Sequence, residues 1–337
     1  MVGRSNVHGD PKSPDTLPAS VPGRSRVVPP PAFRAKAAKV SWLLPRTAGA
    51  ATGIAMLGAL SGVAWAQGFE GGARLIGLAD AQRALGTGND AIYSNPAGMA
   101  LGRAYMVELG YLDDLRGSDR RFNASIVDSQ AGPISGGLAY THSSARPLDV
   151  PSGDERLGGH RVDVAVAAPF SDTAAIGATI RYLSYARSSG DEKLEGGFSG
   201  LTFDAGLQWR LGQGLALGLV GYNLTKSKRP ELPLSWGAGL GFELEHFSIE
   251  SDIRYNTQIG KPRFSGGVGY AIAGLFPLRA GVSYDRADGA VLVSGGLGFV
   301  YERVSADLAY RQRVNKDSSA EDADERILLL AIRAHFL

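Results

Sequence analysis

After residue 103 the chain alternates apolar and polar side chains over many long stretches. The odd-numbered positions of residues 201–210 are apolar: Leu201, Phe203, Ala205, Leu207 and Trp209. Residues 162–168 and 247–256 follow the same two-residue period. Such a period is typical of β-strands that place one face in an apolar environment. It predicts fourteen strands, at residues 104–113, 120–129, 133–143, 159–169, 174–186, 199–210, 213–224, 233–244, 246–256, 262–272, 277–285, 290–300, 303–313 and 325–337.

The lengths of these strands and of their connections favour a transmembrane barrel over a soluble β-sandwich. The strands hold 9–13 residues, which suits a tilted crossing of a bilayer, whereas strands of soluble proteins most often hold about 5–6. Short turns, as at 130–132, 170–173 and 211–212, interleave with longer polar connections. The longer connections are residues 144–158, 187–198, 225–232 and 314–324. We therefore predict an all-β protein, a 14-stranded antiparallel transmembrane β-barrel with its short turns on the periplasmic side.

Aromatic residues gather near the ends of the predicted strands on the apolar face, as in the interfacial girdles of membrane barrels. They are Tyr105, Tyr111, Tyr182, Trp209, Trp236, Phe242, Tyr255, Tyr284, Phe299 and Tyr310. The last strand has an apolar face that ends on Phe336. A terminal strand that closes on an aromatic residue resembles the targeting pattern of outer-membrane barrels. It predicts the barrel-assembly machinery as a partner.

Upstream of the strands, residues 74–101 have the pattern of short helices and tight turns instead. Asn89 or Asp90 can cap a short helix that begins at Asp90 or Ala91. We expect this segment to form a short N-terminal helical plug, residues 67–103, inside the barrel.

The plug contains a rigid corner formed by Asn95, Pro96, Ala97 and Gly98. Pro96 excludes a helical conformation at Asn95 and removes a backbone donor. The Asn95 side chain can bond to the local backbone. Gly98 permits a left-handed or a closely packed backbone. We expect this corner to turn the chain from the plug into the first strand.

Residues 74–101 resemble the N-terminal signature of the FadL-type outer-membrane channels and of their PorV/PorQ-type relatives. The matching features are Arg74 followed by Gly77, the Asn-Asp-Ala sequence at 89–91, and the Asn-Pro-Ala-Gly corner followed by Met99. Residues 169–182 and 202–224 are also similar to the PorV-like branch. The resemblance implies a 14-stranded barrel in the outer membrane.

For function, the resemblance implies a channel for passive uptake of hydrophobic small molecules such as fatty acids. Such a solute needs an apolar pocket, and the candidate liners are Phe69, Leu75, Ile76, Leu78, Ile92, Tyr93 and Met99. The alternative is a PorV-like scaffold or secretion-associated barrel that binds protein partners and transports nothing. A structural barrel without transport activity is the third hypothesis.

The N-terminal residues predict export. Residues 1–33 are rich in proline, serine and arginine without periodicity, which predicts disorder. Basic residues then precede an apolar stretch, residues 48–65, and an Ala-Trp-Ala sequence that predicts signal-peptide cleavage before Gln67. An uncleaved membrane anchor is the alternative, because the stretch is about long enough to span a bilayer. The predicted domains are the leader with its signal peptide (1–66), the plug (67–103) and the barrel (104–337).

Composition excludes several classes of function. The chain has no cysteine, which excludes a disulfide framework and thiol catalysis. Residues 1–66 carry eight Lys/Arg and two Asp, which leaves 27 basic and 31 acidic residues in the remainder. A slightly acidic mature protein is no candidate for nucleic-acid binding. We expect a monomer in the outer membrane of a Gram-negative bacterium, in contact with membrane lipid and lipopolysaccharide.

No catalytic or metal-binding motif is present. The histidines of the mature chain, His142, His160, His246 and His335, do not form a zinc-protease motif, and there is no nucleophile elbow. The sequence therefore predicts no enzyme, no cofactor and no metal site. The acidic residues at 321–325 fit a solvated loop, with a divalent ion that bridges lipopolysaccharide as the alternative.

Charged residues of both signs occupy the polar face of the strands. They are Glu108, Arg161, Asp163, Asp204, Glu250, Asp252, Arg254, Arg279, Asp307, Arg311 and Arg333. Because neither sign dominates, we expect cross-strand ion pairs that stabilise the barrel and dock the plug, rather than an ion-selective pore.

Overall fold

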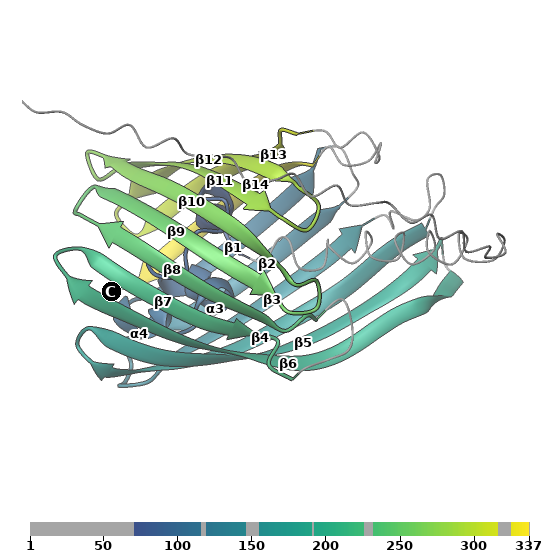
Figure 1. The fold of residues 1–337 in the computed structure, drawn as a ribbon, viewed down its shortest axis with the longest axis horizontal. Helices are drawn as coiled ribbons and strands as arrows, with labels where there is room; N and C mark the ends of the chain where they lie inside the picture. The colour runs from purple at the N-terminus through teal and green to yellow at the C-terminus, as the bar shows by residue number, and fades with distance from the viewer. Residues whose placement is uncertain are drawn as a thin grey trace, which may run out of the picture. The chain divides into compact units, whose positions relative to one another are not determined.

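The computed structural model describes residues 71–115, 119–145, 155–190, 192–225, 232–315 and 325–336. Within them the chain forms three short helices and fourteen strands (Figure 1). In order they are α2 (Ala73–Gly77), α3 (Gly88–Ser94), α4 (Gly98–Leu101), β1 (Tyr105–Asp114), β2 (Arg120–Asp128), β3 (Ser135–Ala145), β4 (Glu155–Ser171), β5 (Ala174–Ser189), β6 (Glu192–Gly212), β7 (Leu215–Tyr222), β8 (Ser235–Glu243), β9 (Phe247–Asn256), β10 (Lys261–Ile272), β11 (Phe276–Asp285), β12 (Val291–Tyr301), β13 (Val304–Arg313) and β14 (Arg326–Phe336).

Each strand pairs antiparallel with its neighbours along the chain, and β1 also pairs with β14, so the sheet closes into a barrel. The pairing of Tyr105 with Phe336 brings their rings together edge to face at a centroid distance of 5.3 Å. The prediction of an all-β, 14-stranded antiparallel barrel is confirmed. Closure leaves no free sheet edge among the paired strands, which is what allows a β-sheet to cross a membrane.

Strands β4, β5 and β6 extend beyond their neighbours, at the end away from the turns that join β4 to β5 and β6 to β7 (Figure 1). They hold 17, 16 and 21 residues. The prediction of a loop at residues 187–198 is therefore wrong, because Arg187 pairs with Leu194 in a continued hairpin. This part of the hairpin is polar on both faces, so its sequence has no apolar alternation to reveal a strand.

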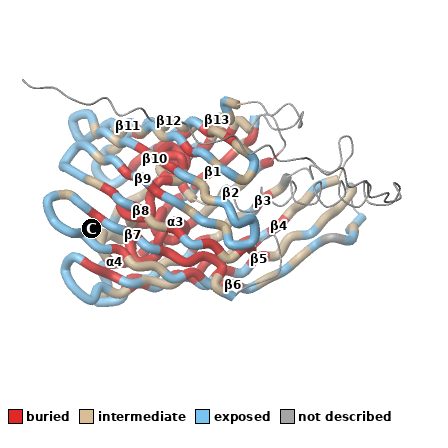
Figure 2. The backbone as a smooth tube through the Cα atoms, in the orientation of Figure 1, coloured by how far each residue is buried: buried red, intermediate tan, exposed pale blue. Residues whose placement is uncertain are grey.

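The facing of the strands follows the sequence pattern. In β6, Leu201 is 62% exposed on the outer face, whereas Asp204 and Gln208 on the lumen face are 1% exposed. Buried residues concentrate in the helices and in the part of the barrel that surrounds them (Figure 2). The apolar face of each strand thus forms the outer surface of the barrel, as expected for contact with lipid.

A charge on the outer face of the barrel should destabilise it. We expect Leu207→Arg to lower the free energy of unfolding by about 2–4 kcal/mol, because it places a guanidinium against lipid, opposite Leu219 in the middle of β7. Leu207→Met, which keeps an apolar side chain of similar volume, should cost less than about 1.5 kcal/mol. Urea titration of the refolded barrel in lipid vesicles, followed by heat-modified gel mobility, measures both. Equal losses for the two variants would contradict the outward facing of Leu207.

The three helices lie inside the barrel, which agrees with the predicted helical plug. Helix α2 packs against β11–β14, α3 against β1–β4, and α4 against β3–β5. None of the described helices has the length and apolar character needed to span a membrane. Residues 67–70 lie outside the described residues, so the predicted boundaries of the plug remain a prediction. Below, "the plug" means residues 71–102.

Two local predictions for the plug need correction. Helix α3 begins at Gly88 and its cap residue is Thr87, with no side-chain cap bond. Asn89 and Asp90 instead reach the barrel wall, where the Asn89 amide donates to Ser125 Oγ at 2.8 Å. The corner also does not lead directly into the first strand, because its last residue, Gly98, begins α4. For Asn89 and Asp90, contacts with the wall replace the local role that the sequence suggested.

Candidate functional site

Glycines on the lumen face of the wall form the seat of the plug. At these positions a Cβ atom would meet plug atoms, so the backbone of the plug can approach the strands closely. A Cβ at Gly218, for example, would collide with the carbonyl of Arg83, and one at Gly177 would lie 2.5 Å from Ala97 N. The seat comprises Gly137, Gly177, Gly206, Gly218, Gly237, Gly239, Gly241, Gly267, Gly281 and Gly296. It runs from β3 to β12, so the plug contacts most of the lumen wall.

Two carboxylates of β9 hold the middle of the plug by its backbone. Asp252 Oδ2 accepts the N–H groups of Gln82 at 2.9 Å and Arg83 at 3.0 Å. Glu250 Oε1 accepts the N–H groups of Ala84 and Leu85, the latter at 3.1 Å. These four consecutive N–H groups lie between α2 and α3, so they have no partners within a helix of the plug. The carboxylates of the wall accept them instead.

An ion pair strengthens the same attachment. Arg83 Nη1 lies 2.9 Å from Asp252 Oδ2, and both side chains are buried. Burial by itself would lower the pKa of Arg83, but Tyr222 and Asp252 outweigh it and raise the pKa above its ordinary value. The guanidinium therefore stays charged, and a charged pair in a dry site is costly to break from one side.

Two further ion-pair groups connect the plug to the wall. Asp80 Oδ2 lies 3.0 Å from Arg263 Nη2 and 3.0 Å from Arg311 Nη1. Asp90 Oδ2 lies 3.1 Å from Arg333 Nη2, which also pairs with Glu108. These contacts confirm that the lumen charges pair and dock the plug. They anchor it to β10, β13 and β14, whereas the two carboxylates belong to β9, which pairs with β10.

A separate belt of ion pairs lines β4–β6 above the plug. Arg181 bridges two carboxylates, with Nε 2.8 Å from Asp163 and Nη2 2.7 Å from Asp204. Arg161 Nε is 2.7 Å from Asp163. All four side chains are almost fully buried, so these charged groups pair with one another and are not exposed to a solute.

The corner is held by its asparagine. Asn95 Nδ2 donates to the carbonyls of Arg83 at 2.8 Å and Leu207 at 2.9 Å. Asn95 Oδ1 accepts the Ala97 N–H at 3.3 Å, which confirms the expected local bond. One side chain thus joins two parts of the plug to β6.

The sequence allowed either a left-handed or a closely packed backbone at Gly98, and the structure shows the second. It begins α4, and it is not among the residues with positive φ. A Cβ at Gly98 would instead collide with the Gly86 carbonyl and lie 2.6 Å from Gln208 Oε1. Glycine is needed here because the chain packs closely against itself and against the wall.

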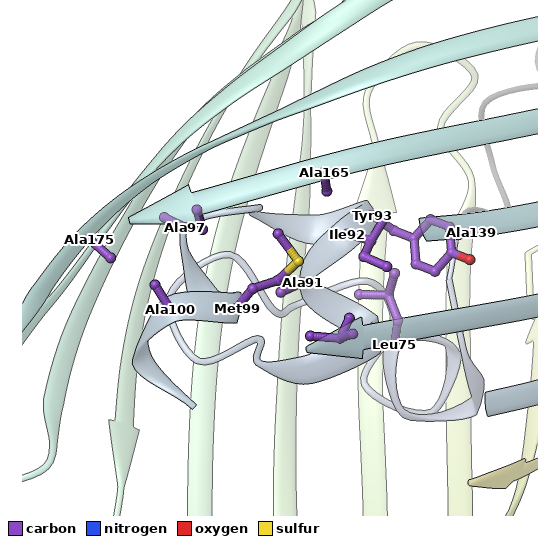
Figure 3. Packing of buried hydrophobic residues seen from close by; sticks show 12 residues of the cluster. Leu75, Ala91, Ile92, Tyr93, Ala97, Met99, Ala100, Ala139, Ala165 and Ala175 are labelled. Atoms are coloured by element: carbon purple, nitrogen blue, oxygen red, sulfur yellow. The ribbon is translucent and has the colours of Figure 1, made fainter. Parts of the chain in front are cut away.

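The described candidate liners are buried in the hydrophobic core between the plug and the wall. Leu75, Ile92, Tyr93 and Met99 form one buried cluster with small residues of β3–β5, including Ala139, Ala165 and Ala175 (Figure 3). Ile76 packs with Leu112, Ile327 and Leu329 in a second cluster, and Leu78 lies against Gly267 and Gly281. Phe69 lies outside the described residues. Their role in binding a solute stays a prediction.

Tyr93 joins this core to the ion-pair belt. The Arg161 guanidinium lies 5.3 Å from the centre of its ring, and Asn123 Nδ2 donates to its hydroxyl. Burial raises the pKa of Tyr93 above its usual value, and the charge of Asp163 adds to the effect. The ring therefore stays neutral and belongs to the packing of the plug.

Sequence reasoning missed an aromatic surface on the lumen side of the β4–β6 extension. Tyr185 and Phe198 are register partners whose rings stack at a centroid distance of 5.1 Å. Tyr185 also lies over Gly159, and a Cβ at Gly200 would lie 3.0 Å from Leu232 Cδ1. We call these residues the rim platform. The available signal was one aromatic at the end of a predicted strand, Tyr185, and one in the predicted loop, Phe198.

The fold is similar to those of several solved structures, among them two toluene transporters and a FadL homologue. The toluene transporter TbuX of Ralstonia pickettii matches with a TM-score of 0.59 and 12% identity over 80% of this chain and 99% of that chain. The toluene transporter TodX of P. putida matches with a TM-score of 0.59 and 16% identity over 79% of this chain and 97% of that chain.

A FadL homologue of Pseudomonas aeruginosa matches with a TM-score of 0.57 and 13% identity over 80% of this chain and 98% of that chain. No protein-family model and no curated protein matches the sequence. At these identities the similarity shows the fold alone, a barrel like those of the two toluene transporters and the FadL homologue, and this agrees with the resemblance in residues 74–101.

Proposed function

We propose that this FadL-type barrel is an outer-membrane channel for passive uptake of hydrophobic small molecules. The observation that carries the proposal is the rim platform, an aromatic surface on the lumen side above a plugged barrel. An apolar compound can leave water by adsorbing to Tyr185 and Phe198, and the burial of its surface drives the step. A lumen filled by the plug excludes bulk water flow, so it suits a solute that moves along apolar surfaces.

The identity of the solute is part of the proposal. TbuX and TodX are toluene transporters by name, and one further neighbour is a FadL homologue. We infer the same broad class for this chain, monoaromatic hydrocarbons or fatty acids. The candidate liners of the plug would meet the solute only after the plug shifts, because they are buried against the wall.

Loss of the rim platform should slow uptake. We expect the double variant Tyr185→Ser, Phe198→Ser to reduce the initial rate of uptake about tenfold, because each aromatic side chain contributes about 0.5–1.5 kcal/mol to such a contact. Labelled toluene and labelled oleate, given to cells that express the barrel, measure the rate. Tyr270→Ser, which removes an aromatic from the outer wall, is the control and should leave the rate unchanged.

The outcome separates uptake from the alternatives. An unchanged rate for the double variant in a correctly folded barrel would remove the rim platform from the route. No uptake by the wild type above empty cells would overturn transport altogether.

A PorV-like scaffold that binds protein partners is the second candidate. The packing of the plug favours it, because every described candidate liner is buried against the wall and none is accessible to a solute. Co-purification of a protein partner with the wild type, together with absent uptake, would support it. Export by a cleaved signal peptide, assembly through β14, contact with lipopolysaccharide and a monomeric state are further parts of our proposal.

A further inference from the structure

Two histidines that are 18 residues apart in the sequence meet on the outer face of the barrel. His142 of β3 and His160 of β4 are directly opposite each other in the register of the two strands. Their ring centroids lie 4.9 Å apart with an interplanar angle of 37°. Both residues are exposed, so the pair is accessible from outside the wall.

A third side chain orients one of the two rings. The Tyr140 hydroxyl shares a hydrogen bond of 2.7 Å with His160 Nδ1, and the two rings stack at 5.9 Å. When Nδ1 donates to the phenol oxygen, the lone pair of His160 Nε2 is free for another partner. Metal-binding histidines commonly have such a hydrogen bond on the nitrogen that does not bind the metal.

The separation of the rings fits one shared metal ion. With a metal–nitrogen bond of about 2.0–2.1 Å and a tetrahedral angle, two imidazoles on one ion have ring centroids about 5 Å apart. The observed 4.9 Å agrees with that distance. Imidazole nitrogen is a preferred ligand of zinc, copper and nickel, and a poor ligand of calcium and magnesium.

The pair lies at the water-side border of the apolar band. Along β3 the outward residues change from Leu138 to Tyr140, His142 and Ser144, and along β4 the apolar run from Val166 to Val162 ends at His160. On β1 and β2, Asp113 and the exposed Arg120 form an ion pair at 3.4 Å. This height corresponds to the headgroup layer, which aqueous metal ions reach.

We propose that His142 and His160 form a surface binding site for a divalent transition-metal ion such as Zn²⁺, with Tyr140 as the residue that positions His160. No group of three or more His, Cys, Asp or Glu that could hold a metal occurs in the part of the chain that the structure describes. The site is therefore a two-histidine site, and water or phosphate oxygens of the headgroup layer complete the coordination. The bound ion links β3 to β4.

Zinc titration of the folded, detergent-purified barrel tests the proposal. We expect one Zn²⁺ site in the wild type by isothermal titration calorimetry, and its loss in His142→Ala and in His160→Ala. Tyr140→Phe should keep both ligands but weaken binding about tenfold, as expected for loss of an orienting hydrogen bond. Zn²⁺ should also raise the unfolding temperature of the wild type and leave that of the two alanine variants unchanged.

The control is His246→Ala, which removes an exposed histidine from the turn before β9. It should bind Zn²⁺ as tightly as the wild type. Three results would overturn the proposal: no zinc binding by the wild type, equal binding by wild type and His142→Ala, or loss of binding in His246→Ala. Heat-modified gel mobility shows that each variant is folded, so a failure to bind cannot be a failure to fold.

Discussion

Replacing Asp252 by Ala should release the plug from its seat while the barrel stays closed. The change leaves the buried Arg83 guanidinium without its partner at 2.9 Å and leaves the N–H groups of Gln82 and Arg83 without an acceptor. Breaking a buried pair from one side costs about 3–5 kcal/mol, and the barrel strands do not depend on this pair. We expect frequent large conductance events in planar bilayers, where the wild type should be almost silent.

The matched control is Glu245→Ala, which removes a carboxylate from the exposed turn between β8 and β9. It should leave conductance at the level of the wild type. Limited proteolysis gives a second readout, since a released plug should be cut within residues 71–102 while the barrel stays protected. Wild-type conductance and protection in Asp252→Ala would contradict the role of the carboxylate in holding the plug.

Gly98→Ala should displace the corner of the plug. The added Cβ collides with the Gly86 carbonyl and approaches Gln208 Oε1, so the backbone of α4 must move. Overpacking of this kind costs about 1–3 kcal/mol, and Gly98→Val should cost more. We expect increased leakage of bulky polar antibiotics into cells and impaired uptake of labelled fatty acid, since both depend on the position of the plug.

Gly136→Ala is the control for this prediction, because a Cβ at Gly136 meets nothing within 4 Å. It should change neither leakage nor uptake. If Gly98→Ala also leaves both unchanged in a folded barrel, the corner is only a turn, and its position controls neither leakage nor uptake.

The sequence by itself determined the barrel and the facing of its strands. A strand that crosses lipid must expose apolar side chains on one face, so every crossing leaves a two-residue period in the chain. The pattern in residues 201–210 therefore predicted that Leu201 faces outward and Asp204 inward. The presence of a helical plug and the pairing of the lumen charges followed from the same local evidence.

Where the alternation of apolar and polar residues is absent, only the tertiary structure determines the secondary structure and the contacts. The outer part of the β5–β6 hairpin is polar on both faces, so no apolar alternation marks it, and only the pairing of Arg187 with Leu194 shows it to be strand. Asn89 and Asp90 look like helix caps in the sequence. Their side chains bond to the wall because the barrel places Ser125 and Arg333 within reach.

The contacts on which our proposals rest also could not be predicted from local sequence. The attachment of Arg83 to Asp252 joins residues 169 positions apart, and the His142–His160 pair depends on the register of β3 against β4. No local preference records which residue of one strand lies opposite which residue of another. Register and plug placement are properties of the closed barrel, because they result from all strands pairing around one set of buried contacts.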